Sequence, residues 1–244
     1  MVLQSPDFRP AGYAFLIEHF NLKVIPNWHA SRVAATGTTR SRIEDGLVES
    51  TYPSSYWPGD QIQDHLEFAL KYDGFNPGIL AAIFQVIDPI VIASWVSSRP
   101  TGRNARRAWF MFEFITGKKL PLPDVKTGNY VNLLDPDDYY TSSPGRRSPR
   151  HRIIDNQLGV PAFSPVVRRT ERLREMEAMD LSQRCAKIVT AYPPELMRRA
   201  LAYLYSRETK SSFQIEHIRV DSSRTEKFIF LLEHAGLQDF VTED

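Results

Sequence analysis

Two residues near the C-terminal end, Ser212 and Glu216, have types and a spacing that could carry chemistry. They stand four positions apart, and on an α-helix this separation places both side chains on one face. A carboxylate held in this way can form a charge-assisted pair with an arginine. From the spacing alone, an ordinary surface pair at a helix end is the favoured interpretation, because so short a pattern is a weak signal.

The densest cluster of charge lies in residues 146–152, Arg-Arg-Ser-Pro-Arg-His-Arg. We call its four arginines the basic cluster: Arg146, Arg147, Arg150 and Arg152. They could contact a protein partner, phosphate groups or nucleic acid. We favour a simpler interpretation, in which the arginines pair with the acidic stretch at 135–138 just upstream.

Other kinds of chemistry are not indicated by the sequence. Neither common form of the glycine-rich phosphate-binding loop occurs. Cys185 falls inside an apolar-periodic helix, which predicts a buried, unreactive thiol. His29 and His65 have no partner at metal-ligand spacing, and His151 lies between two arginines that oppose both a metal and a proton. We therefore predict no catalytic residue and no metal site in this chain.

The composition is that of an ordinary soluble globular protein, with 42% hydrophobic and 24% charged residues in 244. Thirty basic and 29 acidic residues give a net charge of +1, so no overall field favours nucleic acid. A single cysteine fits a reducing compartment. No run approaches the roughly 20 apolar residues that cross a bilayer, and residues 1–10 lack a signal pattern. We predict a cytoplasmic protein with no membrane partner.

Helical periodicity dominates the first half of the chain. It predicts helices over about 60–74, 77–87, 88–98 and 102–116, and four successive helices with short joints favour a bundle. Asp88-Pro89 is a cap followed by proline at the first helical position, and Gly117 is a stop signal. Before them we expect a short helix at 13–20 and strand-like pieces at 22–25 and 48–52.

Residues 118–165 break this rhythm, being rich in proline and poor in periodicity. We expect this irregular belt to pack on the helices through its scattered large side chains: Tyr130, Leu133, Leu134, Tyr139, Tyr140, Ile153, Ile154 and Phe163. Helices return at 166–178 and 181–192, and a further helix from Pro193 leads towards Ser212. The predicted fold is mainly α, a helical bundle with a few short N-terminal strands and a long irregular central segment. Its three parts are 1–117, 118–165 and 166–244.

Ser212-x-x-x-Glu216 resembles the inhibitory motif of Fic-domain proteins, Ser/Thr-x-x-x-Glu-Gly/Asn. Further stretches are similar to the long N-terminal region of bacterial Fic proteins: Asp64-His65-Leu66-Glu67-Phe68-Ala69-Leu70-Lys71-Tyr72, Pro100-Thr101-Gly102-Arg103, Ala105-Arg106-Arg107-Ala108-Trp109-Phe110, Gly128-Asn129-Tyr130-Val131 and Pro149-Arg150-His151-Arg152. Together they span most of residues 10–236. His217 stands where the family has Gly or Asn. The family's catalytic loop, His-Pro-Phe-x-Asp/Glu-Gly-Asn-Gly-Arg, does not occur, since none of the six histidines precedes a proline.

The resemblance implies a function in protein AMPylation, in which the family transfers AMP from ATP, with magnesium, to a hydroxyl of a target protein. This chain would be the N-terminal regulatory and target-recognition part, and ATP and magnesium would bind to a Fic catalytic core, in the same chain or a separate one. Glu216 would pair with an arginine of the nucleotide site, and Ser212 would fix the helix by a hydrogen bond. No activity is expected from this chain alone.

Two alternatives stay open at this point. The chain could be a stand-alone helical module that binds a protein or nucleic-acid partner through the irregular belt and the basic cluster. It could also be an enzyme of unknown type built from scattered Asp, Glu and Arg residues, which ranks last because no spacing supports it.

Overall fold

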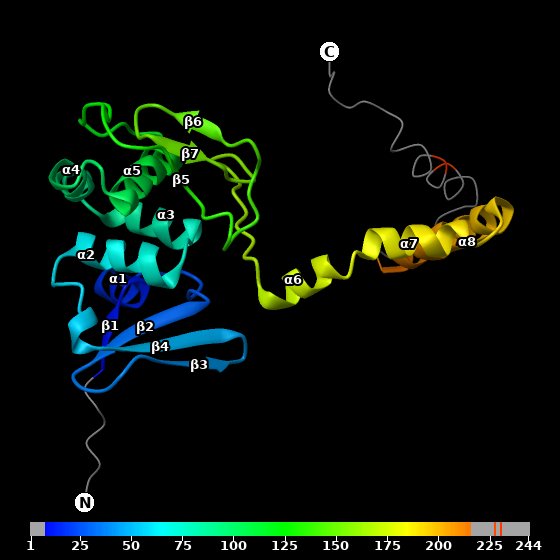
Figure 1. Ribbon diagram of the computed structural model, residues 1–244, viewed down its shortest axis with the longest axis horizontal. Helices are drawn as coiled ribbons and strands as arrows, with labels where there is room; N and C mark the ends of the chain where they lie inside the picture. Colours follow the sequence, from blue (N-terminus) through cyan, green and yellow to red (C-terminus); the bar gives the residue numbers. More distant parts are fainter. Residues whose placement is uncertain (1–7, 216–226, 228–229, 231–244) are drawn as a thin grey trace, which may run out of the picture. The chain divides into compact units, whose positions relative to one another are not determined.

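The computed structural model describes residues 8–215 together with residues 227 and 230 (Figure 1). Contacts group the chain into two compact units, residues 1–170 and residues 171–244. We call them the first and the second unit and describe each by itself. The predicted parts 1–117 and 118–165 both fall within the first unit.

A four-stranded mixed sheet opens the first unit, in the order β1-β2-β4-β3. Its strands are β1 (Phe8–Ala11), β2 (His29–Ala34), β3 (Arg40–Glu44) and β4 (Leu47–Pro53). β2 runs parallel to β4, and the other two pairings are antiparallel. The buried side chains of β2 include His29 and Ser31, and the His29 ring Nε2 lies 2.8 Å from the Ser50 hydroxyl of β4. Polar pairing therefore replaces apolar contact over part of this buried surface.

Helices cover the sheet and build the core above it (Figure 1). They are α1 (Tyr13–His19), the 3₁₀ turn η1 (Ser54–Tyr56), α2 (Ile62–Phe68), the π-helix η2 (Ala69–Asp73), α3 (Pro77–Val86), α4 (Pro89–Ser98) and α5 (Arg103–Thr116). The predicted start of α4 and the predicted end of α5 are confirmed. The side chain of Asp88 accepts the Ile90 N–H at 2.9 Å, and Gly117 ends α5 in the left-handed conformation.

The main core lies between these helices. Its fully buried large side chains include Trp109, Phe112, Leu66, Leu80, Ile83 and Ile92. Burying an aliphatic or aromatic side chain of this size stabilises the fold by about 1.5–3 kcal/mol. The indole N–H of Trp109 still finds a partner, since it donates to Glu113 Oε1 at 2.8 Å.

Asp73, the last residue of η2, joins the helices to the sheet. Its carboxylate is fully buried and accepts the Tyr13 backbone N–H at 2.9 Å and the hydroxyl of Ser31. Burial raises its pKa to about 7, although the two hydrogen bonds oppose that shift. Gly12 precedes α1 at φ 61°, and a Cβ there would overlap Asp73 Oδ2, so only glycine fits this close approach.

The belt predicted to be irregular contains a second, three-stranded sheet. Its order is β5-β7-β6, with β5 (Val131–Asn132), β6 (Arg146–Ser148) and β7 (Ile153–Asp155). β5 pairs parallel and β6 antiparallel with β7. The expected anchors Leu133, Leu134, Tyr139 and Ile153 are buried, which confirms that the belt packs on the helices. The expectation is wrong for Phe163, which is 74% exposed.

The prediction of a mainly helical bundle is wrong, because 45% of the structure is helix and 17% is strand in two mixed sheets. The missed strands lack the alternating apolar pattern that reveals a half-buried strand. β3 is exposed along its whole length, β2 buries polar residues, and the strands of the second sheet have only two or three residues. Residues 22–25, predicted to be strand-like, have no regular structure.

The second unit contains α6 (Glu171–Ala178), α7 (Leu181–Thr190) and α8 (Pro194–Ile215). α6 begins five residues later than predicted, because residues 166–170 run along the first unit, where Tyr139 and Arg168 form a β-bridge. Cys185 is exposed on α7, so the prediction of a buried thiol is wrong. Of the described helices, none is by itself long and apolar enough to cross a membrane.

Candidate functional site

Ser212, the first of the two motif residues, lies in the last turn of α8. The helix runs over 22 residues, from Pro194 to Ile215, and includes Ser212. The predicted helical setting of Ser212 is therefore confirmed. Glu216 lies outside the described residues, so its pairing with Ser212 or with an arginine stays a prediction.

The basic cluster splits into two internal and two exposed arginines. Arg150 lies against Glu113, whose carboxylate accepts its Nε at 3.1 Å and its Nη2 at 2.9 Å. The Nη1 of Arg150 donates to Asp124 Oδ1 and to the Leu122 carbonyl, both at 2.9 Å. The expected pairing of Arg150 with residues 135–138 is wrong, because Glu113 and Asp124 are its partners.

Arg152 is also used inside the fold. All three of its guanidinium nitrogens donate to backbone carbonyls, those of Val125, Lys126 and Gly128, at 2.6–3.1 Å. Together with Arg150 it ties the loop after α5 to the turn before β7. Arg146 and Arg147 stay exposed on β6, and the Arg147 guanidinium lies 5.4 Å from the centre of the Tyr130 ring. Two of the four arginines therefore have their guanidinium groups engaged inside the fold.

His151, inside the same turn, is buried. Its Nε2 lies 3.2 Å from Glu113 Oε2, and its Nδ1 lies 2.8 Å from the Ser148 hydroxyl. Burial lowers its pKa to about 4, with the Glu113 carboxylate opposing and the Arg150 cation adding to the shift. The neighbouring arginines were expected to oppose the proton on His151, but desolvation is the larger cause.

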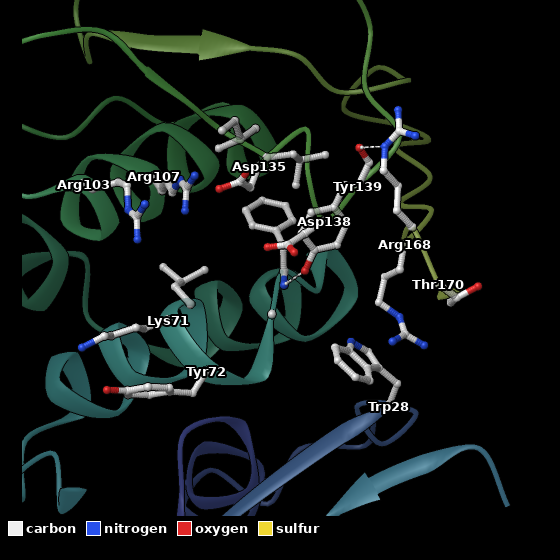
Figure 2. Close-up of a pocket in the computed structure, with 16 residues that line it drawn as sticks. Trp28, Lys71, Tyr72, Arg103, Arg107, Asp135, Asp138, Tyr139, Arg168 and Thr170 are labelled. Carbon is white, nitrogen blue, oxygen red and sulfur yellow. Dashed lines mark hydrogen bonds between the residues drawn. The ribbon is translucent and has the colours of Figure 1, made fainter. Parts of the chain in front are cut away.

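A cavity that sequence reasoning did not predict lies in the first unit (Figure 2). Its volume is about 320 Å³. Its walls come from η2, the start of α5, the segment 133–139 and the segment 168–170. We call it the basic pocket, because it is lined by five cationic side chains and only two carboxylates: Lys71, Arg103, Arg107, Arg168 and Arg169, with Asp135 and Asp138.

The start of α5 supplies one wall of the basic pocket. Arg103 and Arg107 stand one helical turn apart and point from α5 into the same space in Figure 2. Arg107 is buried, and its Nε donates to the Asn132 carbonyl at 2.9 Å. Burial, followed by the cation of Arg103, lowers the pKa of Arg107 to about 10, which leaves it charged at neutral pH.

The opposite wall is built around Trp28 (Figure 2). The guanidinium of Arg168 lies 3.6 Å from the centre of its ring, a cation–π contact. Tyr139 closes the pocket behind it, and its hydroxyl accepts the Phe75 backbone N–H at 2.8 Å. Gly74 sits between these rings at φ 87°, where a Cβ would lie 2.7 Å from the Tyr139 hydroxyl and 3.3 Å from the Trp28 ring.

The residues of the basic pocket come from segments far apart in the sequence, so no motif could reveal it. One local signal was present. Arg103 and Arg107 are like charges four positions apart on one helix face, an arrangement that costs stability unless something compensates it. Neither has a carboxylate at ion-pair distance within the described part of the chain.

Among residues 8–215, 227 and 230, no group of three or more His, Cys, Asp or Glu side chains could hold a metal ion. No protein-family model, no curated protein and no solved structure matches this chain significantly. The likeness to the N-terminal region of Fic proteins therefore rests on the motifs themselves.

Proposed function

We propose that this chain is the N-terminal regulatory and target-recognition part of a Fic-family protein adenylyltransferase. The observation that supports the proposal is the course of α8, which runs without a break through Ser212 and ends at Ile215, directly before Glu216. The inhibitory motif requires a helix at this point. A continuation of α8 by one residue would bring Ser212 and Glu216 onto one face.

In this proposal the carboxylate of Glu216 occupies an arginine that would otherwise bind the γ-phosphate of ATP. A charge-assisted pair of this kind is worth about 1.5–3 kcal/mol. That free energy corresponds to a loss of productive ATP binding of about tenfold to a hundredfold. ATP and magnesium belong to the Fic catalytic core, which transfers AMP to a hydroxyl of the target protein.

The test joins this chain to a Fic catalytic core and measures auto-AMPylation. We expect Glu216→Gln to raise the rate by about tenfold or more, because the amide keeps the shape of the side chain and loses its charge. Glu208→Gln is the matched control, since Glu208 is an exposed carboxylate on α8 two helical turns earlier. An unchanged rate in Glu216→Gln, or an equal rise in the control, would remove Glu216 from the mechanism.

The alternative of a nucleic-acid or protein-binding module through the basic cluster has less support. The guanidinium groups of Arg150 and Arg152 donate hydrogen bonds to partners within the fold. Only Arg146 and Arg147 stay exposed, and two arginines release few counterions. The test replaces Arg146 and Arg147 by glutamate and measures retention on DNA at low salt. If the variant is retained as strongly as the wild-type protein, nucleic-acid binding through the basic cluster is excluded.

A further inference from the structure

Arg107 is a buried cation whose hydrogen-bonding capacity is only partly used. Its Nε donates to the Asn132 carbonyl. Within the described ranges, no acceptor and no carboxylate at ion-pair distance meets its two terminal nitrogens. The carboxylates of Asp135 and Asp138 attract the Arg107 cation only from beyond ion-pair distance, and neither accepts a hydrogen bond from it. Both terminal NH₂ groups, in the fork geometry that suits carboxylate and phosphate, face the basic pocket (Figure 2).

The neighbouring Arg106 provides an internal comparison. It is also buried, but its terminal nitrogens donate to three backbone carbonyls, those of Thr101, Asn129 and Arg152, at 2.9–3.2 Å. Arg106 therefore holds the fold together. Arg107, one position further along the same helix, has no comparable set of acceptors. The terminal nitrogens of Arg106 are thus occupied by the fold, whereas those of Arg107 are available to bind a ligand.

Trp28 also lines the basic pocket and carries a second donor that lacks a partner. Its indole N–H is buried and meets no acceptor among the residues the structure describes. A buried tryptophan N–H usually has a hydrogen-bond partner. With Arg168 stacked on the ring at 3.6 Å, this wall presents donors and positive charge. Two lining residues of the basic pocket, Arg107 and Trp28, thus have donors that meet no acceptor among the described residues.

The size and charge of the pocket narrow the class of ligand. About 320 Å³ is at the lower end of small-molecule sites, so a large polymer does not fit inside. Five cationic groups against two carboxylates favour an anion of more than one charge. A phosphate group offers three strong acceptor oxygens and close to two charges near neutral pH.

We propose that the basic pocket binds a phosphate group, held by Arg103 and Arg107 from α5. The phosphate can come from a small ester or from the free ion, and these two sources share the same chemistry. The site lies in the first unit and does not include Ser212.

Isothermal titration calorimetry on the full chain at physiological salt tests the site, with phenyl phosphate and inorganic phosphate as probes and phenol as the uncharged control. Saturable binding of either phosphate at one site per chain, with none for phenol, is the expected result. Tighter binding of phenyl phosphate identifies an ester as the ligand, and equal binding identifies the free ion. Absence of saturable binding for both at millimolar concentration would overturn the proposal.

Two variants and a matched control locate the binding. Arg107→Gln and Arg103→Gln should each weaken it by about tenfold to a hundredfold. Arg146→Gln should leave it unchanged, since Arg146 is an exposed arginine of the same unit outside the pocket. Circular dichroism checks that each variant is folded. If Arg107→Gln does not fold, Arg103→Gln alone tests the site, because Arg103 is exposed and its replacement should not disturb the core. An equal loss in Arg146→Gln, or undiminished binding in Arg103→Gln, would contradict the proposed site.

Discussion

Glu113 is the acceptor on which the link between α5 and the belt depends. Its side chain is 9% exposed and accepts hydrogen bonds from the Trp109 indole, the Leu120 backbone N–H and two nitrogens of Arg150. His151 Nε2 lies 3.2 Å from the same carboxylate. Replacement by glutamine removes the charge and puts an NH₂ group against partners that are almost all donors.

The magnitude follows from the burial of this pair. A hydrogen bond to a charged group contributes about 1.5–3 kcal/mol. Removing one partner of a buried ion pair costs about 3–5 kcal/mol, because the other charge is left without compensation. The Arg150 side chain is 21% exposed and keeps Asp124 and the Leu120 and Leu122 carbonyls, which reduces that cost. We expect Glu113→Gln to lower the free energy of unfolding by about 3 kcal/mol.

Urea unfolding followed by tryptophan fluorescence measures this change. All four tryptophans lie in the first unit, so the signal reports the unit that contains Glu113. Glu67→Gln is the control, because Glu67 forms an ion pair with Arg99 in which the two side chains are 35% and 59% exposed. That pair should contribute less than about 1 kcal/mol. Equal losses in the two variants would refute the role assigned to Glu113.

Three further predictions follow from buried groups of the first unit, each read from the free energy of unfolding. Since burial raises the pKa of Asp73 from 3.8 to about 7, the folded state holds a proton that the unfolded state has lost, and stability should fall as pH rises between these values. Asp73→Asn should remove that decline, and a decline that persists would show another group to be its cause. Since burial lowers the pKa of His151 from 6.5 to about 4, its contribution is complete above pH 6.5 and is lost as pH falls towards 4. His151→Gln should reduce this acid loss, and an unaltered acid profile would contradict it. Gly12→Ala should destabilise by more than about 2 kcal/mol, because its Cβ would overlap the Asp73 carboxylate at a positive φ, and a neutral change would contradict the close approach.

Much of the helical structure could be predicted because its signals are local. The caps Asn76 and Asp88, each followed by a proline, fix where α3 and α4 begin. Gly117 fixes where α5 ends, and apolar residues recur at helical spacing between these points. Such signals depend on neighbours within one or two turns, so they survive without knowledge of the fold.

The sheets could not be predicted for a physical reason. β2 buries His29 and Ser31, whose partners Ser50 and Asp73 lie 21 and 42 positions away. From sequence alone a polar residue is predicted to be exposed, because the partner that allows its burial is not known. The same holds for the basic pocket, where Trp28 and Arg168 are 140 positions apart and meet only in the folded unit. The partners of Arg150 were misassigned because the nearest acids in sequence seemed sufficient, while Glu113 lies 37 positions away.

The most direct test of the central claim is the affinity of ATP for a Fic catalytic core joined to this chain, measured by equilibrium binding with magnesium present. The proposal predicts that Glu216→Gln tightens ATP binding by about tenfold to a hundredfold, while Glu208→Gln leaves it unchanged. Equal ATP affinity in the wild-type protein and in Glu216→Gln would contradict it.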